Sequence, residues 1–61
     1  MQVGDLVRLS AYGKKMKTHR RVTKRDPLGI IYRISAPWFY VKWPIMGLQY
    51  QYFRQDLKYA K

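Results

Sequence analysis

Cysteine and glutamate are both absent from this 61-residue chain, and aspartate occurs only three times. Without cysteine, neither disulfides nor thiolate metal sites can form. No hydrophobic run approaches the ~18 residues that a membrane span requires. The first five residues also lack the basic start and the apolar stretch of a signal peptide. We therefore expect a protein that stays in the cytoplasm and makes no membrane contact.

Groups for acid–base chemistry are equally scarce. The candidates are His19, Asp5, Asp26 and Asp56. His19 lies within a basic run and has no carboxylate nearer in the sequence than Asp26, and two of the aspartates adjoin turn residues. There is no glycine-rich phosphate loop and no metal-ligand spacing. We predict that the protein is not an enzyme and that it holds no cofactor or metal.

Positive charge and aromatic residues are abundant instead. Thirteen lysines and arginines give a formal net charge of +10, and six tyrosines, two tryptophans and two phenylalanines contribute to a hydrophobic fraction of 48%. Such a composition is too apolar for a disordered tail. The charge favours polyanions, nucleic acid first and an anionic membrane surface second.

Short β-rich runs separated by turn residues cover most of the chain. We expect strands at 6–9, 30–34, 38–43 and 48–53, with a short last strand in the tail after 54. No window has a helical apolar pattern longer than about two turns. The sequence predicts one all-β domain over residues 1–61, a five-stranded meander closed into a small barrel. Residues 10–26 are predicted to form a long, mobile, basic first loop.

Alternation along these runs predicts the core. On the third strand, Phe39, Val41 and Trp43 form the wholly apolar and therefore inward set, opposite Trp38, Tyr40 and Lys42. The other positions expected to point inward are Val7, Leu9, Ile30, Ile34 and Leu57. The fourth strand stays open between Leu48, Tyr50 and Tyr52 on one face and Gln49, Gln51 and Phe53 on the other.

Four segments in this order resemble a known architecture. They are Val3–Leu9 (VGDLVRL), Gly29–Ile34 (GIIYRI), Tyr40–Trp43 (YVKW) and Asp56–Lys58 (DLK). The order is similar to that of SH3-like small barrels of the KOW and Tudor branches. It also resembles short SH3-like proteins encoded by tailed phages, including phages of marine cyanobacteria, which implies a viral protein in the cytoplasm of its host. Because the first loop is much longer than in the KOW pattern, a ribosomal or elongation-factor role does not carry over.

The first loop holds the strongest chemical feature of the sequence. Seven of the thirteen basic residues and the histidine fall between positions 14 and 25, with no acidic residue among them: Lys14, Lys15, Lys17, His19, Arg20, Arg21, Lys24 and Arg25. One interpretation is a solvated loop whose charge is incidental. The other is a phosphate-binding segment whose affinity falls steeply with salt.

A second feature is the outward set of the third strand. Trp38, Tyr40 and Lys42, with Arg33 and Arg8 expected on neighbouring strands, interleave aromatic and basic side chains. Such a surface stacks bases of a single strand or inserts an aromatic ring at the minor groove of a duplex. The alternative is that a small barrel simply leaves some aromatic residues half-exposed.

Together these features predict a small basic nucleic-acid-binding protein that contacts phosphates with little sequence preference. DNA is the first expected partner and RNA the second. The alternative is a phage structural, adaptor or host-interaction protein that docks an acidic protein partner. A proline-rich-peptide SH3 domain and a methyl-lysine cage are disfavoured, because both use carboxylates that this chain scarcely has.

Overall fold

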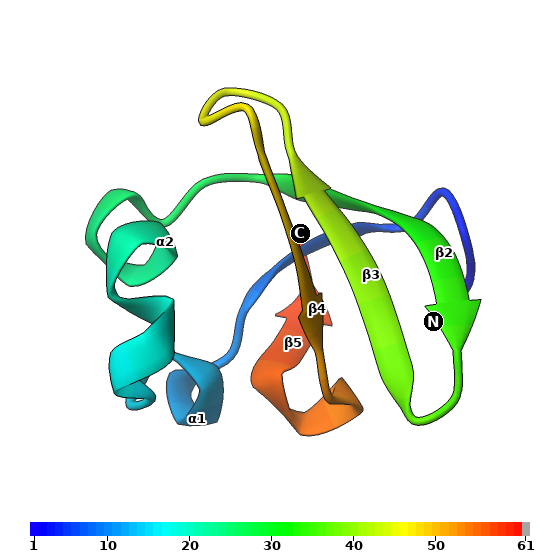
Figure 1. The fold of residues 1–61 in the computed structure, drawn as a ribbon, viewed down its shortest axis with the longest axis horizontal. Coiled ribbons are helices and arrows are strands. Elements are labelled where there is room, and N and C mark those ends of the chain that lie inside the picture. The colour runs from blue at the N-terminus through cyan, green and yellow to red at the C-terminus, as the bar shows by residue number, and fades with distance from the viewer. Residues whose placement is uncertain (61) are drawn as a thin grey trace.

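The computed structural model describes residues 1–60 and consists mainly of one five-stranded antiparallel sheet (Figure 1). The strands are β1 (Leu6–Leu9), β2 (Gly29–Ser35), β3 (Trp38–Trp43), β4 (Leu48–Tyr52) and β5 (Leu57–Tyr59). Their order in the sheet is β4-β3-β2-β1-β5. The extents of 25 × 22 × 21 Å are nearly equal. A small, mainly β structure is therefore confirmed.

Residues 10–26 are helical rather than an open loop, so that part of the sequence prediction is wrong. They form α1 (Ala11–Lys14), the 3-10 turn η1 (Lys17–His19) and α2 (Arg20–Arg25). Ser10 caps α1, because its hydroxyl accepts a hydrogen bond from the backbone N–H of Gly13 at 3.0 Å. Helices this short carry too few apolar residues to produce a recognisable period, and tertiary packing stabilises them instead.

The core combines the sheet and the helical segment. Its buried members are Val7, Leu9, Val22, Ile31, Val41, Trp43, Tyr52 and Leu57, and Phe39 packs against them while partly exposed. The predicted inward positions on β1, β3 and β5 are thereby confirmed. Val22 comes from α2, which means that one apolar side chain anchors an otherwise basic helix to the sheet.

The second strand differs from the prediction because it contains a bulge. Ile31, not Ile30, pairs with Val41 and is buried, and the register then shifts between Ile31 and Arg33. The extra residue rephases the strand. Ile30 consequently lies on the outer face, and Ile34 regains an inner partner only at the strand end, where it is 38% exposed.

The open question about the fourth strand is settled by its register with β3. Leu48 pairs with Trp43, and Tyr52 pairs with Phe39. Since directly opposed residues of antiparallel strands lie on the same face, Leu48, Tyr50 and Tyr52 occupy the inner face. Of these, Tyr52 is fully buried and Tyr50 is exposed.

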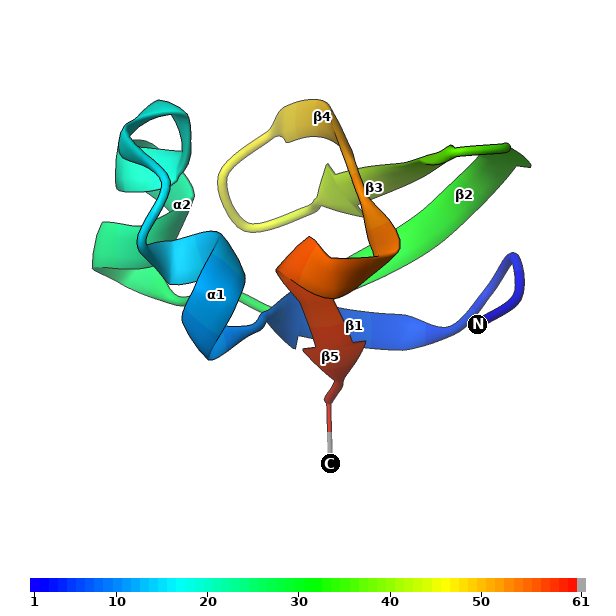
Figure 2. The same cartoon turned by 90° about the horizontal axis from the view of Figure 1, so that it is seen from below.

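The helical segment lies on one side of the molecule, and the β2–β3 hairpin extends on the other (Figure 2). The first turn of the helical segment, at α1, docks onto the 3-10 turn η2 (Arg54–Asp56). The backbone N–H of Ser10 donates to the carbonyl of Asp56 at 2.8 Å, and its hydroxyl donates to the carbonyl of Gln55 at 2.6 Å. Gly13 faces the same carbonyl of Asp56 so closely that a Cβ would not fit there. This docking sets the position of α2.

Candidate functional site

The orientation of α2 places its basic side chains at the surface. Val22 points into the core, whereas Arg20, Arg21, Lys24 and Arg25 are exposed. The helix ends at Asp26, which adopts the left-handed conformation at φ 48°, a region that Asn and Asp enter more readily than most residues. With Val22 buried, the four cations of α2 lie on its solvent-exposed side.

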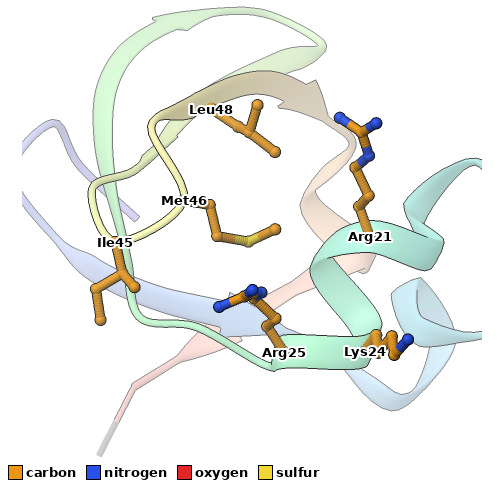
Figure 3. Close-up of a pocket in the computed structure, with 6 residues that line it drawn as sticks. All are labelled: Arg21, Lys24, Arg25, Ile45, Met46 and Leu48. Atoms are coloured by element: carbon orange, nitrogen blue, oxygen red, sulfur yellow. The ribbon is translucent and has the colours of Figure 1, made fainter.

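An open groove of 380 Å³ lies between α2 and the loop that connects β3 to β4. Its helix side is formed by Arg21, Lys24 and Arg25, and its other side by Ile45 and Met46 of the loop and by Leu48 at the start of β4. In Figure 3, Met46 points from the loop towards α2, Arg21 and Arg25 flank it, and Lys24 points away. The groove thus has a cationic wall and an apolar wall.

A second groove, of 390 Å³, adjoins the first. It is lined by Lys14, Arg20, Arg21, Thr23 and Lys24. Arg21 and Lys24 belong to both grooves, so the two meet across α2. We call the five basic residues that line them the basic surface: Lys14, Arg20, Arg21, Lys24 and Arg25. Five cations therefore surround two adjoining grooves and concentrate positive potential there.

The carboxylate of Asp26 lies at the edge of this surface. Its Oδ1 is 3.3 Å from Lys14 Nζ, and its Oδ2 is 3.8 Å from Arg8 Nη1. All three side chains are substantially exposed, so these pairs contribute little to stability. Arg8, which we expected beside the outward aromatic residues, lies instead beside the end of α2.

The other predicted residues of the helical segment are less involved in the grooves. Lys15 and Lys17 are exposed but line neither groove. His19 is partly buried: its Nδ1 donates to the carbonyl of Gly13 at 2.8 Å, and its ring meets the Tyr52 ring edge-on at 4.8 Å between centroids. These contacts connect the helical segment to β4 and leave Nε2 as the histidine's remaining polar atom.

The outward residues of β3 form a different surface. The guanidinium of Arg33 lies 5.3 Å from the centre of the Tyr40 ring, and Trp38 stacks on Phe53 with centroids 4.5 Å apart. Tyr32 meets Tyr40 edge-on at 6.1 Å. We call this set the aromatic surface: Tyr32, Arg33, Trp38, Tyr40, Lys42 and Phe53. The sequence pattern did not predict Tyr32 or Phe53 on this surface, because Tyr32 lies at the bulge and Phe53 belongs to the fourth-strand run whose orientation the sequence left open.

The two surfaces are separated by the sheet. Val22 of α2 shares the core with Val41 and Trp43, which point inward from β3. Trp38 and Lys42 of the same strand point to the opposite face, since side chains alternate along a strand. The structure therefore does not combine the basic helical segment and the outward aromatic residues into one site.

The sequence pattern did not predict the apolar wall of the first groove. Ile45 is 79% exposed at the tip of the β3–β4 hairpin, while Met46 and Leu48 are partly buried against the core. The one indication in the sequence was an isoleucine within a turn, between Pro44 and Gly47. That this residue lies close to α2 depends on the tertiary fold.

Within residues 1–60 there is no group of three or more metal-ligating side chains, and no helix is long and apolar enough to cross a membrane. Comparison with protein-family models, with curated proteins and with solved structures gives no significant match to the chain.

Proposed function

We propose that this protein is a small, non-enzymatic nucleic-acid-binding protein that contacts DNA phosphates through its basic surface, with little sequence preference. The observation that carries the proposal is the pair of adjoining grooves on α2, lined by five cations with Asp26 as the acidic neighbour. Lysine and arginine that neutralise phosphates release counterions, which provides affinity but carries little sequence information. RNA offers the same phosphates and is the second candidate ligand.

We further propose that the sheet forms an SH3-like small barrel of the KOW, Tudor or phage type, with the helical segment inserted after β1. Three features support this architecture. The strands are short and follow a meander order, the inner faces share one core, and the bulge in β2 increases local twist. A phage origin of this type would place the protein in the cytoplasm of the host cell.

The test is a salt titration of the affinity for a duplex of random sequence. With about five phosphate contacts, log K against log salt should have a slope of roughly −4 to −5. The variant Arg20→Gln/Arg21→Gln/Lys24→Gln should reduce that slope by about two to three units. The matched control is Arg33→Gln/Lys42→Gln/Lys58→Gln, which removes the same net charge away from the basic surface.

Equal losses in the two variants would mean that net charge alone drives binding, and the basic surface would lose its assigned role. No binding by the wild-type protein at low salt would reject the nucleic-acid proposal. The basic surface would then be assigned to an acidic protein partner and tested by co-purification after nuclease digestion.

A further inference from the structure

The groove between α2 and the β3–β4 loop has an apolar wall that phosphate binding does not require. A phosphate needs only the cationic wall formed by Arg21, Lys24 and Arg25. The opposite wall presents Ile45, Met46 and Leu48 to the same space. Exposed apolar side chains that border a cationic groove mark a site for a ligand with an apolar part and an anionic part.

We propose that this groove receives one unpaired nucleotide of a single-stranded nucleic acid. Its base would lie against Met46 and Ile45, with one flanking phosphate against Arg21 and the other against Arg25. The inference rests on the proposed function and narrows it from polyanions in general to strands with accessible bases. The volume of 380 Å³ is near the lower end of small-molecule sites, which are roughly 300–1,000 Å³, and therefore suits one nucleotide rather than a duplex segment.

The arrangement of the two walls fits this ligand. Arg21 and Arg25 are four residues apart, so they lie on the same side of α2. Figure 3 shows them on either side of Met46, which points at the helix between them. The thioether of methionine is polarisable and packs against aromatic rings, and a guanidinium both pairs with phosphate and stacks on a planar ring.

The neighbouring groove can receive the next part of the nucleic-acid strand. Arg21 and Lys24 line both grooves, and Lys14 and Arg20 extend the cations beyond them. The phosphate that precedes or follows the bound nucleotide can therefore be neutralised across α2. A free apolar ligand would gain nothing from these cations, and an inorganic anion would gain nothing from Met46.

The experiment compares two ligands that carry the same phosphates. One is a single-stranded DNA of eight nucleotides, and the other is an abasic chain of the same length. We expect the wild-type protein to bind the DNA about tenfold more tightly. The variant Ile45→Ser/Met46→Gln should lose most of that preference without losing affinity for the abasic chain. The control Ile45→Val/Met46→Leu should keep the preference for DNA. The variant Arg21→Gln/Arg25→Gln should weaken the binding of both ligands.

Met46 is partly buried, so its replacement can affect the fold. The variant Ile45→Ser alone provides a second measurement, because Ile45 is exposed and its replacement leaves the core intact. It should reduce the preference about threefold. Equal binding of both ligands by the wild-type protein, or a preference that survives both variants, would overturn the inference and leave phosphate binding intact. A preference lost in Trp38→Ala instead would transfer base contact to the aromatic surface. Failure to bind either ligand while duplex DNA still binds would also overturn the inference, whereas failure to bind all three at low salt would reject the proposed function itself.

Discussion

Trp43 and Tyr52 are joined inside the core by a hydrogen bond in which the indole Nε1 donates to the phenol oxygen at 3.0 Å. Their rings meet edge-on with centroids 5.9 Å apart, and both side chains are buried. On its other side, Tyr52 contacts the His19 ring of the helical segment. One phenol therefore satisfies the indole N–H, connects β4 to β3 and supports the segment that carries the basic surface.

Removing the Tyr52 hydroxyl should destabilise the protein. In Tyr52→Phe the buried indole N–H of Trp43 loses its acceptor, which costs about 1–3 kcal/mol. Denaturant unfolding followed by tryptophan fluorescence measures the change. A variant as stable as the wild-type protein would mean that another group accepts the N–H.

Stability should also fall in strong alkali because of the same side chain. Burial raises the pKa of Tyr52 from 10.0 to about 12. The folded-state pKa lies above the unfolded value, so the protonated phenol contributes its full stabilisation below pH 10. Between about pH 10 and 12 this contribution to the free energy of unfolding is lost, by about 2–3 kcal/mol in total. The free energy of unfolding should be compared with that of Tyr52→Phe across this range, because lysine titration affects both proteins equally. The difference should shrink above pH 10, and a constant difference would contradict the pKa shift.

Gly13→Ala should be destabilising although it replaces glycine by alanine in a helix. Alanine is normally favoured there by about 1 kcal/mol. At this position the Cβ would collide with the backbone carbonyl of Asp56, so we expect a net loss of about 1–3 kcal/mol in unfolding free energy. Ala11→Gly, elsewhere in the same helix, reports the intrinsic propensity alone. A stabilised Gly13→Ala variant would show that α1 does not dock on η2.

Asp26→Asn should strengthen binding to polyanions with little effect on stability. The substitution removes the carboxylate beside Lys14 and Arg8, and asparagine tolerates the left-handed backbone. We expect a change in stability below about 1 kcal/mol and an affinity for duplex DNA raised about two- to fivefold at low salt. Asp5→Asn changes net charge equally but lies near the opposite end of β1, so it should have the smaller effect. Equal gains in both would point to net charge alone.

The two tryptophans should respond differently to truncation. Trp43 is fully buried, and Trp43→Ala should cost about 3–5 kcal/mol, enough to unfold much of a domain this small. Trp38 is partly exposed and stacked on Phe53, so Trp38→Ala should cost about 1 kcal/mol. Circular dichroism and thermal unfolding distinguish the two variants, and a folded Trp43→Ala would mean that the two faces of β3 are exchanged.

The strands were predictable where alternation is uninterrupted. On β3, the wholly apolar set of Phe39, Val41 and Trp43 could only face inward, and the structure confirms it. On β2 the same reasoning misplaced Ile30, because a bulge adds one residue without any mark in the apolar pattern. Bulges depend on the geometry of paired strands, so the pattern of one strand does not locate them.

The candidate site shows the same division. The cluster of positive charge between Lys14 and Arg25 is a property of composition, and it was visible without a structure. Its helical form was not, since α2 is too short to establish a period and depends on Val22 reaching the core.

The sequence by itself determined the β-rich character, the inward set of β3 and the excess positive charge, because each depends on neighbouring residues or on composition. Only the tertiary structure decided that the basic and aromatic surfaces lie on opposite sides of β3, and that Met46 faces Arg21 and Arg25. Those relationships join residues that are not neighbours in the chain, and packing of one shared core, rather than any local preference, sets the distance between them.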